Sequence, residues 1–480
     1  MRKIITISAL IPVLLMTGCS QIPTYEKPKT ELPDQENWKK LPPKVDMQLG
    51  QSEQAWWKQL SGDNRLNSLI DEALEHNSDI NIAKLNLQQA RSVLTQNQAA
   101  QYPELSASGT LGRTKNTLNQ YPVDSEYTYG TFSLGALLSY EIDLWGKNDA
   151  LEKQAQANLQ ATEADQKTVK LSVTAAVAQS YLNLMALNQN VKLAQDTVDS
   201  RKETLELRET QLKYGSVTPL NVHQAESELA SVEIALQLQL QQRDLQLHAL
   251  SVLVGQSPKA LTKMMASGLQ TKDLNSLNSL PLPKGLPSEL LERRPDIQAA
   301  EQRLIAANAN IGAAKAALYP SISLTGLFGF SSEALNQLFS DDSIGWTTSA
   351  AIDAPIFDYG KRQSQVQIAK AQKQALVIQY HQTIRTAFKE VLDSLTNLKG
   401  SAKQLASQDR QVDALEKILD LSQKRFDAGY SSYLEVLDAQ RNLFSAQLNR
   451  VDLKLNHAKA LVNLYKALGG KWQDNNKTNS

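Results

Sequence analysis

The 480-residue sequence has very little cysteine, few aromatic residues and no excess of charge of either sign. A single Cys excludes a disulfide scaffold and a zinc site built from several thiolates. Lys plus Arg and Asp plus Glu each number 50, so no basic surface is expected to meet nucleic-acid phosphates. Aromatic residues make up only 6%, whereas Ala, Leu and Gln crowd the middle of the chain, which favours helix.

Motifs of enzymes and of metal sites are also missing from the sequence. The five histidines are scattered without metal-ligand spacing, and there is neither a G-x-S-x-G nucleophile motif nor a phosphate-binding loop. The acidic residues form no pair that stands out from the background. We therefore expect no enzyme activity, no bound metal and no cofactor.

The first twenty residues contain the only long apolar run. Arg2 and Lys3 precede the run Ile4–Met16, which is shorter than the roughly 20 residues of a membrane-spanning helix. Small residues follow and then Cys19, a pattern typical of a bacterial lipoprotein signal, although leucine is usual where Met16 stands. This predicts a signal peptide over residues 1–18 and a lipid anchor on Cys19 that holds the chain to a membrane without spanning it. The alternative is an ordinary signal peptide with an incidental cysteine.

The rest of the chain repeats one design at a long period. The sequence AAQYPELSASG at residues 99–109 returns as AALYPSISLTG at 316–326, an offset of 217. Farther along, LWGK at residues 144–147 corresponds to DYGK at 358–361, an offset of 214. The domain organisation predicted from this is a lipidated extension (19–62), a first structural repeat (63–255), a proline-containing equatorial linker (256–286), a second repeat (287–470) and a polar tail (471–480).

Each repeat has the pattern helix, β-hairpin, very long helix, helix. A first helix is predicted over Asp63–Gln101, where Tyr102-Pro103 ends it because the residue before proline leaves the α region. Thr128–Leu144 alternates apolar and polar residues with period two, as a strand does. Gly146–Tyr214 has a heptad seam that includes Arg201 and Arg208, and no internal Pro or Gly, so it predicts one helix about 100 Å long.

The strands have one apolar and one polar face. Such a wall fits a membrane-spanning β-barrel, apolar outside and polar inside. Four strands cannot close a barrel, and open edges are not tolerated in lipid, so several chains would have to share one barrel. The alternative is a soluble four-stranded sheet that packs on the helices.

Four segments resemble the TolC-like outer-membrane factors, in particular the lipoprotein branch called NodT-type or OprM-like. They are Trp56-Trp57, LNSLIDEALEHNSDINIAKLNLQQA at residues 66–90, ERRPDI at 292–297 with the segment after it, and YLEVLDAQR at 433–441. The resemblance covers essentially the whole mature chain. It implies a homotrimer of the α+β class, with a shared twelve-stranded outer-membrane β-barrel, a long periplasmic α-helical barrel and a mixed equatorial domain.

The resemblance also implies the function of an exit duct in a tripartite efflux pump. The duct would lie in the outer membrane, extend into the periplasm and export drugs or other small toxic compounds. Its partners would be outer-membrane lipid, a periplasmic adaptor and an inner-membrane transporter of the resistance-nodulation-division (RND) type. Two alternatives remain, namely a lipid-anchored periplasmic coiled-coil scaffold without a pore, and an exit duct for type I protein secretion.

The resemblance places a closable aperture at the turns of the two long helical hairpins. Leu434, Asp438 and Arg441 share one helix face by their spacing and match the family's aperture residues, and Glu435 matches a second acidic position. Without the resemblance, Asp438 and Arg441 would be an exposed pair and Leu434 a seam residue. An aspartate–tyrosine latch of some relatives does not carry over, because Asn221 and Phe426 occupy those positions. The tip turns contain Gly215, Pro219, Asn221, Phe426 and Gly429.

Overall fold

The computed structural model describes residues 20–29, 57, 64–115, 128–266 and 293–470. The chain forms two compact units, each described by itself below. One contains Gln88–Thr162 and Ala300–Tyr380 together with residues 20–29, and the other contains the remaining described residues. The predicted signal peptide, Cys19 and the tail 471–480 lie outside the described residues.

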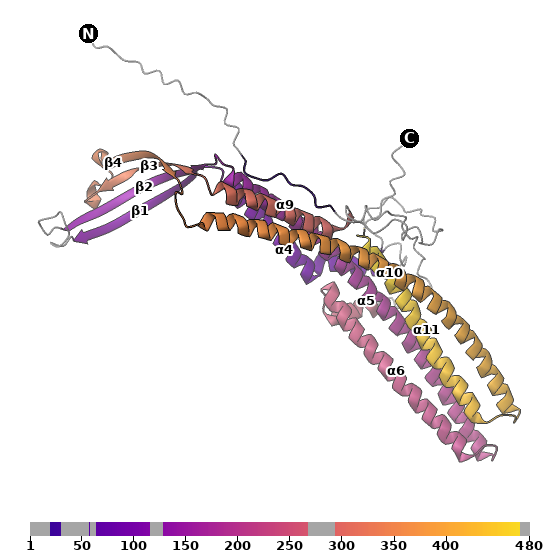
Figure 1. Ribbon diagram of the computed structural model, residues 1–480. Coiled ribbons are helices and arrows are strands. Elements are labelled where there is room, and N and C mark those ends of the chain that lie inside the picture. Colours follow the sequence, from indigo (N-terminus) through magenta and orange to yellow (C-terminus); the bar gives the residue numbers. More distant parts are fainter. Residues whose placement is uncertain (1–19, 30–56, 58–63, 116–127, 267–292, 471–480) are drawn as a thin grey trace, which may run out of the picture. The chain divides into compact units, whose positions relative to one another are not determined.

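The described part of the chain is mostly helical, with one sheet (Figure 1). None of its helices combines the length and the apolar character needed to cross a bilayer. The α-helices are α3 (Asn64–His76), α4 (Ser78–Ala99), α5 (Lys147–Lys213), α6 (Pro219–Val254), α7 (Pro258–Ala266), α9 (Pro295–Ala316), α10 (Lys361–Asp427) and α11 (Tyr433–Ala467), and two short 3-10 turns, Leu335–Gln337 and Asp341–Ser343, lie between β3 (Ser321–Ser332) and β4 (Ile344–Asp353).

The very long helix predicted from the sequence is α5, which differs from the prediction by one residue at each end. The single helix predicted over Asp63–Gln101 is wrong, because the chain breaks at Asn77 into α3 and α4. The Asn77 side chain accepts the backbone N–H of Asp79 (2.9 Å) and of Ile80 (3.2 Å), so it caps the start of α4. Its amide nitrogen also donates to the Leu253 carbonyl (2.8 Å), which fixes the break against the end of α6.

The predicted linker 256–286 is not wholly irregular. Its first part forms the nine-residue helix α7, and residues 267–286 lie outside the described residues. Pro258 occupies the first position of α7, where a missing N–H costs no helical hydrogen bond. Leu261 is fully buried from this helix, so the start of the segment belongs to the packed core.

One antiparallel sheet contains four strands in the order β1 (Glu104–Lys115), β2 (Thr128–Ile142), β3 and β4. The second strand ends at Ile142, two residues before the predicted end, because the Leu144 N–H turns back to the Ile142 carbonyl (2.9 Å). The pairing of β2 with β3 joins the two sequence repeats within one sheet.

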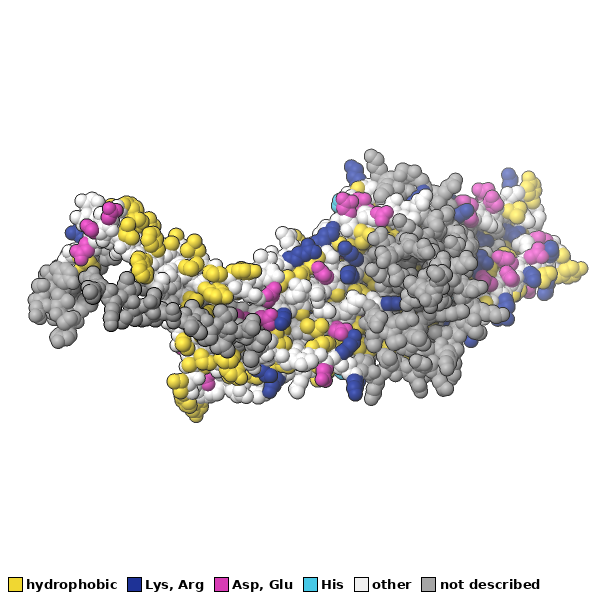
Figure 2. Space-filling model, turned by 90° about the horizontal axis from the view of Figure 1, so that it is seen from above, with side chains coloured by type: hydrophobic (Ala, Val, Ile, Leu, Met, Phe, Trp, Pro, Cys, Tyr) yellow, Lys and Arg dark blue, Asp and Glu magenta, His cyan; other side chains and the backbone are white. Residues whose placement is uncertain are grey.

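The register aligns apolar side chains on one face of the sheet. Phe328 of β3 lies opposite Trp346 of β4 and opposite Ala136 of β2. These side chains have no core to cover them, since Trp346 is 73% exposed and Phe328 is 55% exposed. Figure 2 shows hydrophobic side chains gathered over the strands. An apolar face that is ordered but uncovered suits contact with lipid better than packing on helices.

The opposite face carries short polar side chains. Thr325 of β3 and Ser349 of β4 are cross-strand neighbours whose hydroxyl oxygens lie 2.5 Å apart. Leu137 and Leu327, which face each other across β2 and β3, interrupt this polar face. The alternation predicted for Thr128–Leu144 therefore holds from Gly130 onwards with Leu137 as the exception, and does not extend to Thr128 and Tyr129.

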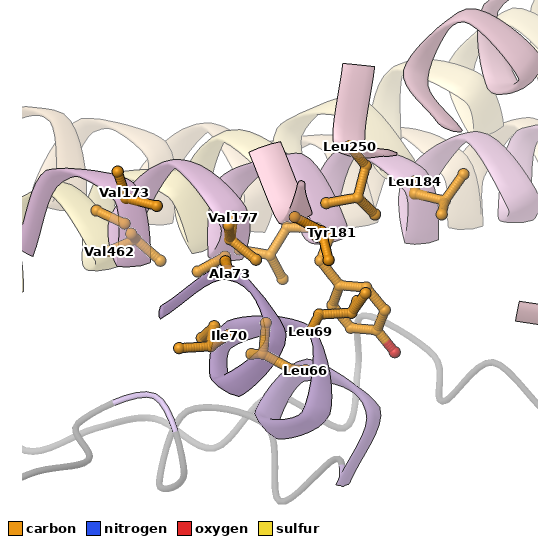
Figure 3. Close-up of a cluster of buried hydrophobic side chains, with 14 of the residues drawn as sticks. Leu66, Leu69, Ile70, Ala73, Val173, Val177, Tyr181, Leu184, Leu250 and Val462 are labelled. Carbon is orange, nitrogen blue, oxygen red and sulfur yellow. The ribbon is translucent and has the colours of Figure 1, made fainter. Parts of the chain in front are cut away.

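The helical unit has its main core where α3 lies across α5, α6 and α11 (Figure 3). Leu66, Leu69 and Ile70 of α3 are fully buried, and Tyr181 of α5 contributes the largest side chain. Burying each Leu or Ile side chain contributes on the order of 1.5–3 kcal/mol. This core holds the long helices together at the end of the unit that contains both α3 and the end of α6.

Residues 20–29 form an extended segment that follows α9 within the sheet-bearing unit. The Asn308 amide donates to the Pro23 carbonyl (2.6 Å), and Lys27 pairs with Glu301 (2.8 Å). Gly312 leaves room for the segment, since a Cβ there would lie 2.6 Å from the Ile22 Cγ1 atom. The chain directly after Cys19 is therefore held on a helix.

Candidate functional site

The two long helical hairpins end in turns of the same construction. α5 ends in a turn in which Gly215 has φ 74°, and α10 ends in one in which Gly429 has φ 76°. In both turns the residue after the glycine donates to the carbonyl five residues back (2.8 Å), and the glycine donates to the carbonyl three back (2.9 Å). This is the Schellman arrangement, which needs a left-handed residue and so favours glycine.

The first turn is closed by its own side chains. Thr218 is the N-cap of α6 and Pro219 is the first helical residue. Asn221 accepts hydrogen bonds from the Thr218 backbone N–H (3.1 Å) and hydroxyl (2.8 Å). The Asn221 side chain is therefore bonded within its own turn of helix.

The second turn is held by an arginine that packs on two neighbouring aromatic rings. The Arg208 guanidinium of α5 lies 4.7 Å from the ring centroid of Phe426 and 4.5 Å from that of Tyr433. The two rings are 5.4 Å apart. Arg208 is almost fully buried, so this cation–π contact is desolvated and joins the end of α10 and the start of α11 to α5. The sequence did place Arg208 on the inward seam of the helix, but the aromatic partners were not predicted.

The predicted aperture residues lie on α11, directly after this turn. Leu434 is 51% exposed, and Glu435 and Asp438 are exposed, whereas Val436 and Leu437 are buried against the other helices of the chain. Within a single chain, Leu434 is thus not buried in the seam between the helices. The face formed by Leu434 and Asp438 points away from the helices of its own chain.

Arg441 shares this face, but it does not pair with Asp438 among the described residues. Its Nε atom donates to the Glu228 Oε2 atom of α6 at 2.6 Å. Glu228 is only 3% exposed. In the single chain Arg441 therefore ties α11 to α6.

Arg201 of α5 completes a buried charge cluster with Glu228. It is also on the predicted seam and is buried. Burial lowers the pKa of Arg201, while the nearby Glu228 carboxylate acts in the opposite direction. Glu228 was not among the residues predicted from the sequence. Two arginines on an otherwise apolar seam did indicate that a buried carboxylate would be needed to compensate their charge.

No other cluster in the described part of the chain suggests catalytic chemistry. No group of three or more His, Cys, Asp or Glu side chains that could hold a metal is found among the described residues. A cavity of about 350 Å³ lies between α5, α6 and α11, and Asn190 and Asp452 are among its lining residues. Burial raises the pKa of Asp452, and a hydrogen bond from Asn190 opposes this effect.

Comparisons with known proteins agree with this architecture. A family model described as "Outer membrane efflux protein" matches residues 69–256 and 286–470. The cation efflux system protein CusC of Escherichia coli O6:H1 is 35% identical over 472 residues, which cover 96% of this chain and 97% of CusC. The toluene efflux pump outer membrane protein TtgI of Pseudomonas putida is 35% identical over 471 residues, which cover 96% of this chain and 97% of TtgI.

Solved structures have the same fold. A crystal structure of CusC matches with a TM-score of 0.80 at 33% identity, covering 94% of this chain and 100% of that one. The outer membrane channel CmeC of Campylobacter jejuni matches with a TM-score of 0.84 at 26% identity, covering 96% and 97%. The predicted fold class, outer-membrane location and homotrimer with four strands from each copy are confirmed. The chain belongs to the outer membrane efflux protein family, as a channel component of a tripartite efflux pump and not an enzyme.

Proposed function

We propose that the closable periplasmic aperture of this channel is formed by the two hairpin turns, at Gly215 and Gly429, together with the N-terminal end of α11. Leu434 supplies an apolar constriction, Asp438 an acidic ring, and Glu435 a second acidic position. The proposal is supported by the exposure of Leu434 and Asp438 on a face that none of the described helices of the same chain covers. In a trimer such a face repeats three times around one axis, so that like residues meet.

The physical chemistry of such a ring favours a gate. Apolar side chains can close a narrow pore by contact and by expelling water. Three carboxylates brought close together repel one another unless a cation or a proton neutralises them. Because Arg441 is already paired with Glu228, it is not free to neutralise Asp438 in the single chain. The acidic ring is therefore left for a cation or a proton to neutralise, while the Leu434 side chains close the pore by apolar contact.

The cargo is proposed to be small toxic compounds that the transporter selects. The pump's other components are a periplasmic adaptor and an inner-membrane RND transporter. Relatives at the same 35% identity are named for cation efflux, for toluene efflux and for antibiotic efflux. Such different cargoes at equal similarity indicate that the duct does not choose among them.

The aperture is tested by opening it. Leu434→Ala combined with Asp438→Ala should raise single-channel conductance in planar bilayers several-fold, because both the apolar contact and the charged ring are removed. The matched control is Leu421→Ala with Asp420→Ala, an exposed leucine and an exposed aspartate on α10 outside the proposed ring. Unchanged conductance, or an equal rise in the control, would remove the assignment of the aperture.

A lipid anchor on Cys19 completes the proposal. Cys19 lies outside the described residues, but the segment that follows it is held along α9 by Asn308 and Glu301. An acyl chain on Cys19 would therefore be attached to an ordered part of the molecule. Such an anchor adds apolar contact with the membrane to that made by the strands.

A further inference from the structure

The cavity of about 350 Å³ in the helical unit contains none of the residues of the proposed aperture. Its walls are one face of α5 and one turn each of α6 and α11. The residues that α5 contributes are spaced by three and four along the helix, and Asn183, Leu187 and Asn190 are among them. Three helices of one chain therefore build the cavity.

The cavity lies on the side of α5 that is turned away from α3. Tyr181 of α5 points into the core that α3 covers (Figure 3). At about 100° per residue, Asn190 lies about half a turn around α5 from Tyr181. The cavity therefore adjoins the main core without being a packing defect inside it.

The floor of the cavity is buried, whereas its rims are open. Ala186 is fully buried and Asn190 is 4% exposed, so both belong to the floor. Leu245 of α6 is 59% exposed and Asp452 of α11 is also exposed, so these two residues stand at the rims. In the single chain, a small molecule can therefore reach the floor between α6 and α11.

Leucine side chains make a large part of the wall apolar. Leu187, Leu245 and Leu455 come from three different helices and line the same space. Sites for small molecules are usually apolar clefts of roughly 300–1,000 Å³ in which a few polar groups fix the orientation of the ligand. The volume and the lining of this cavity match a ligand at the small end of that range.

The polar groups of the cavity have acceptors to spare. The Asn190 side chain donates a hydrogen bond to the Asp452 carboxylate, which uses its amide nitrogen. The Asn190 Oδ1 atom is buried and has no hydrogen-bond partner. The Gln246 amide nitrogen is already engaged, because it donates to the Ser180 hydroxyl (2.6 Å). Asn190 Oδ1 and the remaining lone pairs of Asp452 are therefore left for donors of a ligand.

The charge of the cavity is negative. Among the described lining residues, Asp452 alone carries a charge. Lys459 lies seven residues farther along α11, and its effect on the pKa of Asp452 is smaller than the effects of burial and of Asn190. A carboxylate beside an apolar wall is stabilised by a cation that comes close to it. The ligand that best fits this end of the cavity therefore has a positive charge.

A protonated amine fits these groups better than a metal ion or an anion does. A site for Ca²⁺ usually supplies about six to eight oxygen ligands, several of them carboxylates, whereas this cavity supplies one carboxylate. The described residues include no group of three or more side chains suited to a metal. Asp452 would repel an anion. An amine brings both the charge and the N–H donors, and its hydrocarbon part suits the leucines.

We propose that this cavity binds a small organic ammonium compound. The N–H groups of the ligand donate to the Asp452 carboxylate and to Asn190 Oδ1, and its apolar body packs on Leu187, Leu245 and Leu455. The site lies roughly 35–40 Å along α5 from the turn at Gly215, at about 1.5 Å per residue. It can therefore bind its ligand whether or not the hairpin turns form the aperture.

A pair of probes that differ in charge tests the class of ligand. Naphthylmethylammonium and naphthylmethanol share one apolar body, but only the first has a charged nitrogen. In calorimetric titrations of the detergent-solubilised trimer, with the protein-free detergent titration subtracted, the amine should bind at one site in each subunit about tenfold or more tightly than the alcohol. Equal affinity for the two probes, or no saturable binding of the amine, would overturn the proposal.

Substitution at the rim tests the position of the site. Asp452→Asn should weaken binding of the amine about tenfold or more and leave binding of the alcohol unchanged, because only the charge is removed. Asp413→Asn is the matched control, an exposed aspartate of α10 outside the cavity, and it should leave both affinities unchanged. An unchanged affinity for the amine in Asp452→Asn, or an equal loss in the control, would place the amine elsewhere and overturn the proposal.

The apolar wall has a variant of its own. Leu245→Ala shortens an exposed side chain at the rim, so the fold should tolerate it. It should weaken binding of the amine and of the alcohol by the same several-fold factor, since both probes lose the same apolar contact. Unchanged affinities for both probes would contradict the placement of the apolar body against α6.

Discussion

Glu228 shows how a single buried charge can organise a functional end of the molecule. It lies on α6 with almost no access to solvent, and Arg441 of α11 donates to it at 2.6 Å. Arg201 of α5 is a second cation close to the same carboxylate. Removing a buried counter-charge leaves a cation without compensation, which costs more than an exposed pair is worth.

Glu228→Gln should therefore reduce the stability of the helical unit by about 1.5–3 kcal/mol, the usual value of a hydrogen bond to a charged group. Thermal denaturation of the purified trimer, followed by circular dichroism, would show a lower midpoint. Glu226→Gln is the matched control, because Glu226 is exposed and its ion pair is with the exposed His223. Equal shifts for the two variants would contradict a special role for the buried carboxylate.

The sequence predicted which side chains near the hairpin turns point toward neighbouring helices, but it did not predict which residues they contact. A heptad seam places Arg201 and Arg208 toward other helices, and the structure confirms that both are buried. Their partners lie on other helices, and no spacing along the chain relates Arg208 to Phe426 or Arg441 to Glu228. Those pairs follow only from how four helices come together.

At the scale of elements, the helix expected over Asp63–Gln101 breaks at Asn77, and the spacing of apolar residues along the sequence does not indicate this break. Asn77 satisfies the first N–H groups of α4 with its own side chain and reaches Leu253 at the end of α6. An asparagine within a helical pattern is compatible with either a helix or a cap. The choice here is made by contacts with a distant helix.

Two glycines within helices give the next prediction. Replacing each by alanine adds one methyl group, which should disturb the packing at Gly312 and be tolerated at Gly400. Gly312→Ala in α9 would place a Cβ 2.6 Å from the Ile22 Cγ1 atom and 2.9 Å from its Cα atom, so the extended segment 20–29 must move away. Limited trypsin digestion should then cleave after Lys29 faster than in the wild type, whereas Lys27 is protected from trypsin by the proline that follows it.

Gly400→Ala in α10 is the matched substitution. Nothing lies within 4 Å of the added Cβ. Alanine should therefore leave the digestion unchanged and stabilise the helix by about 0.5–1 kcal/mol through lower backbone entropy in the unfolded chain. Faster cleavage in both variants, or in neither, would contradict the tight docking of residues 20–29 on α9.

At the scale of the whole molecule, the repeat was visible in the sequence because turn residues such as Tyr-Pro and Gly-Lys return at fixed offsets. The apolar strand face was also predictable, since a period of two needs no knowledge of other elements. The helix α7 in the expected linker was not, because prolines there are compatible with both a loop and a helix start.

The membrane attachment is likewise a property of the whole molecule. If Cys19 carries the lipid, Cys19→Ser should abolish incorporation of labelled palmitate into the protein in growing cells. Met16→Leu, which restores the residue usual three positions before such a cysteine, should leave the labelling equal or increase it. Palmitate label that remains on the Cys19→Ser protein would contradict the assignment of the lipid to Cys19.

The two Schellman turns have a consequence for whatever binds the end of the helical hairpins. Their backbones match, yet one is closed by Thr218 and Asn221 and the other by Arg208 packed on two aromatic rings. Three copies therefore present six loops of equal shape but of two alternating chemistries. A binding protein with six equivalent subunits would have to tolerate both surfaces or rely on every second one.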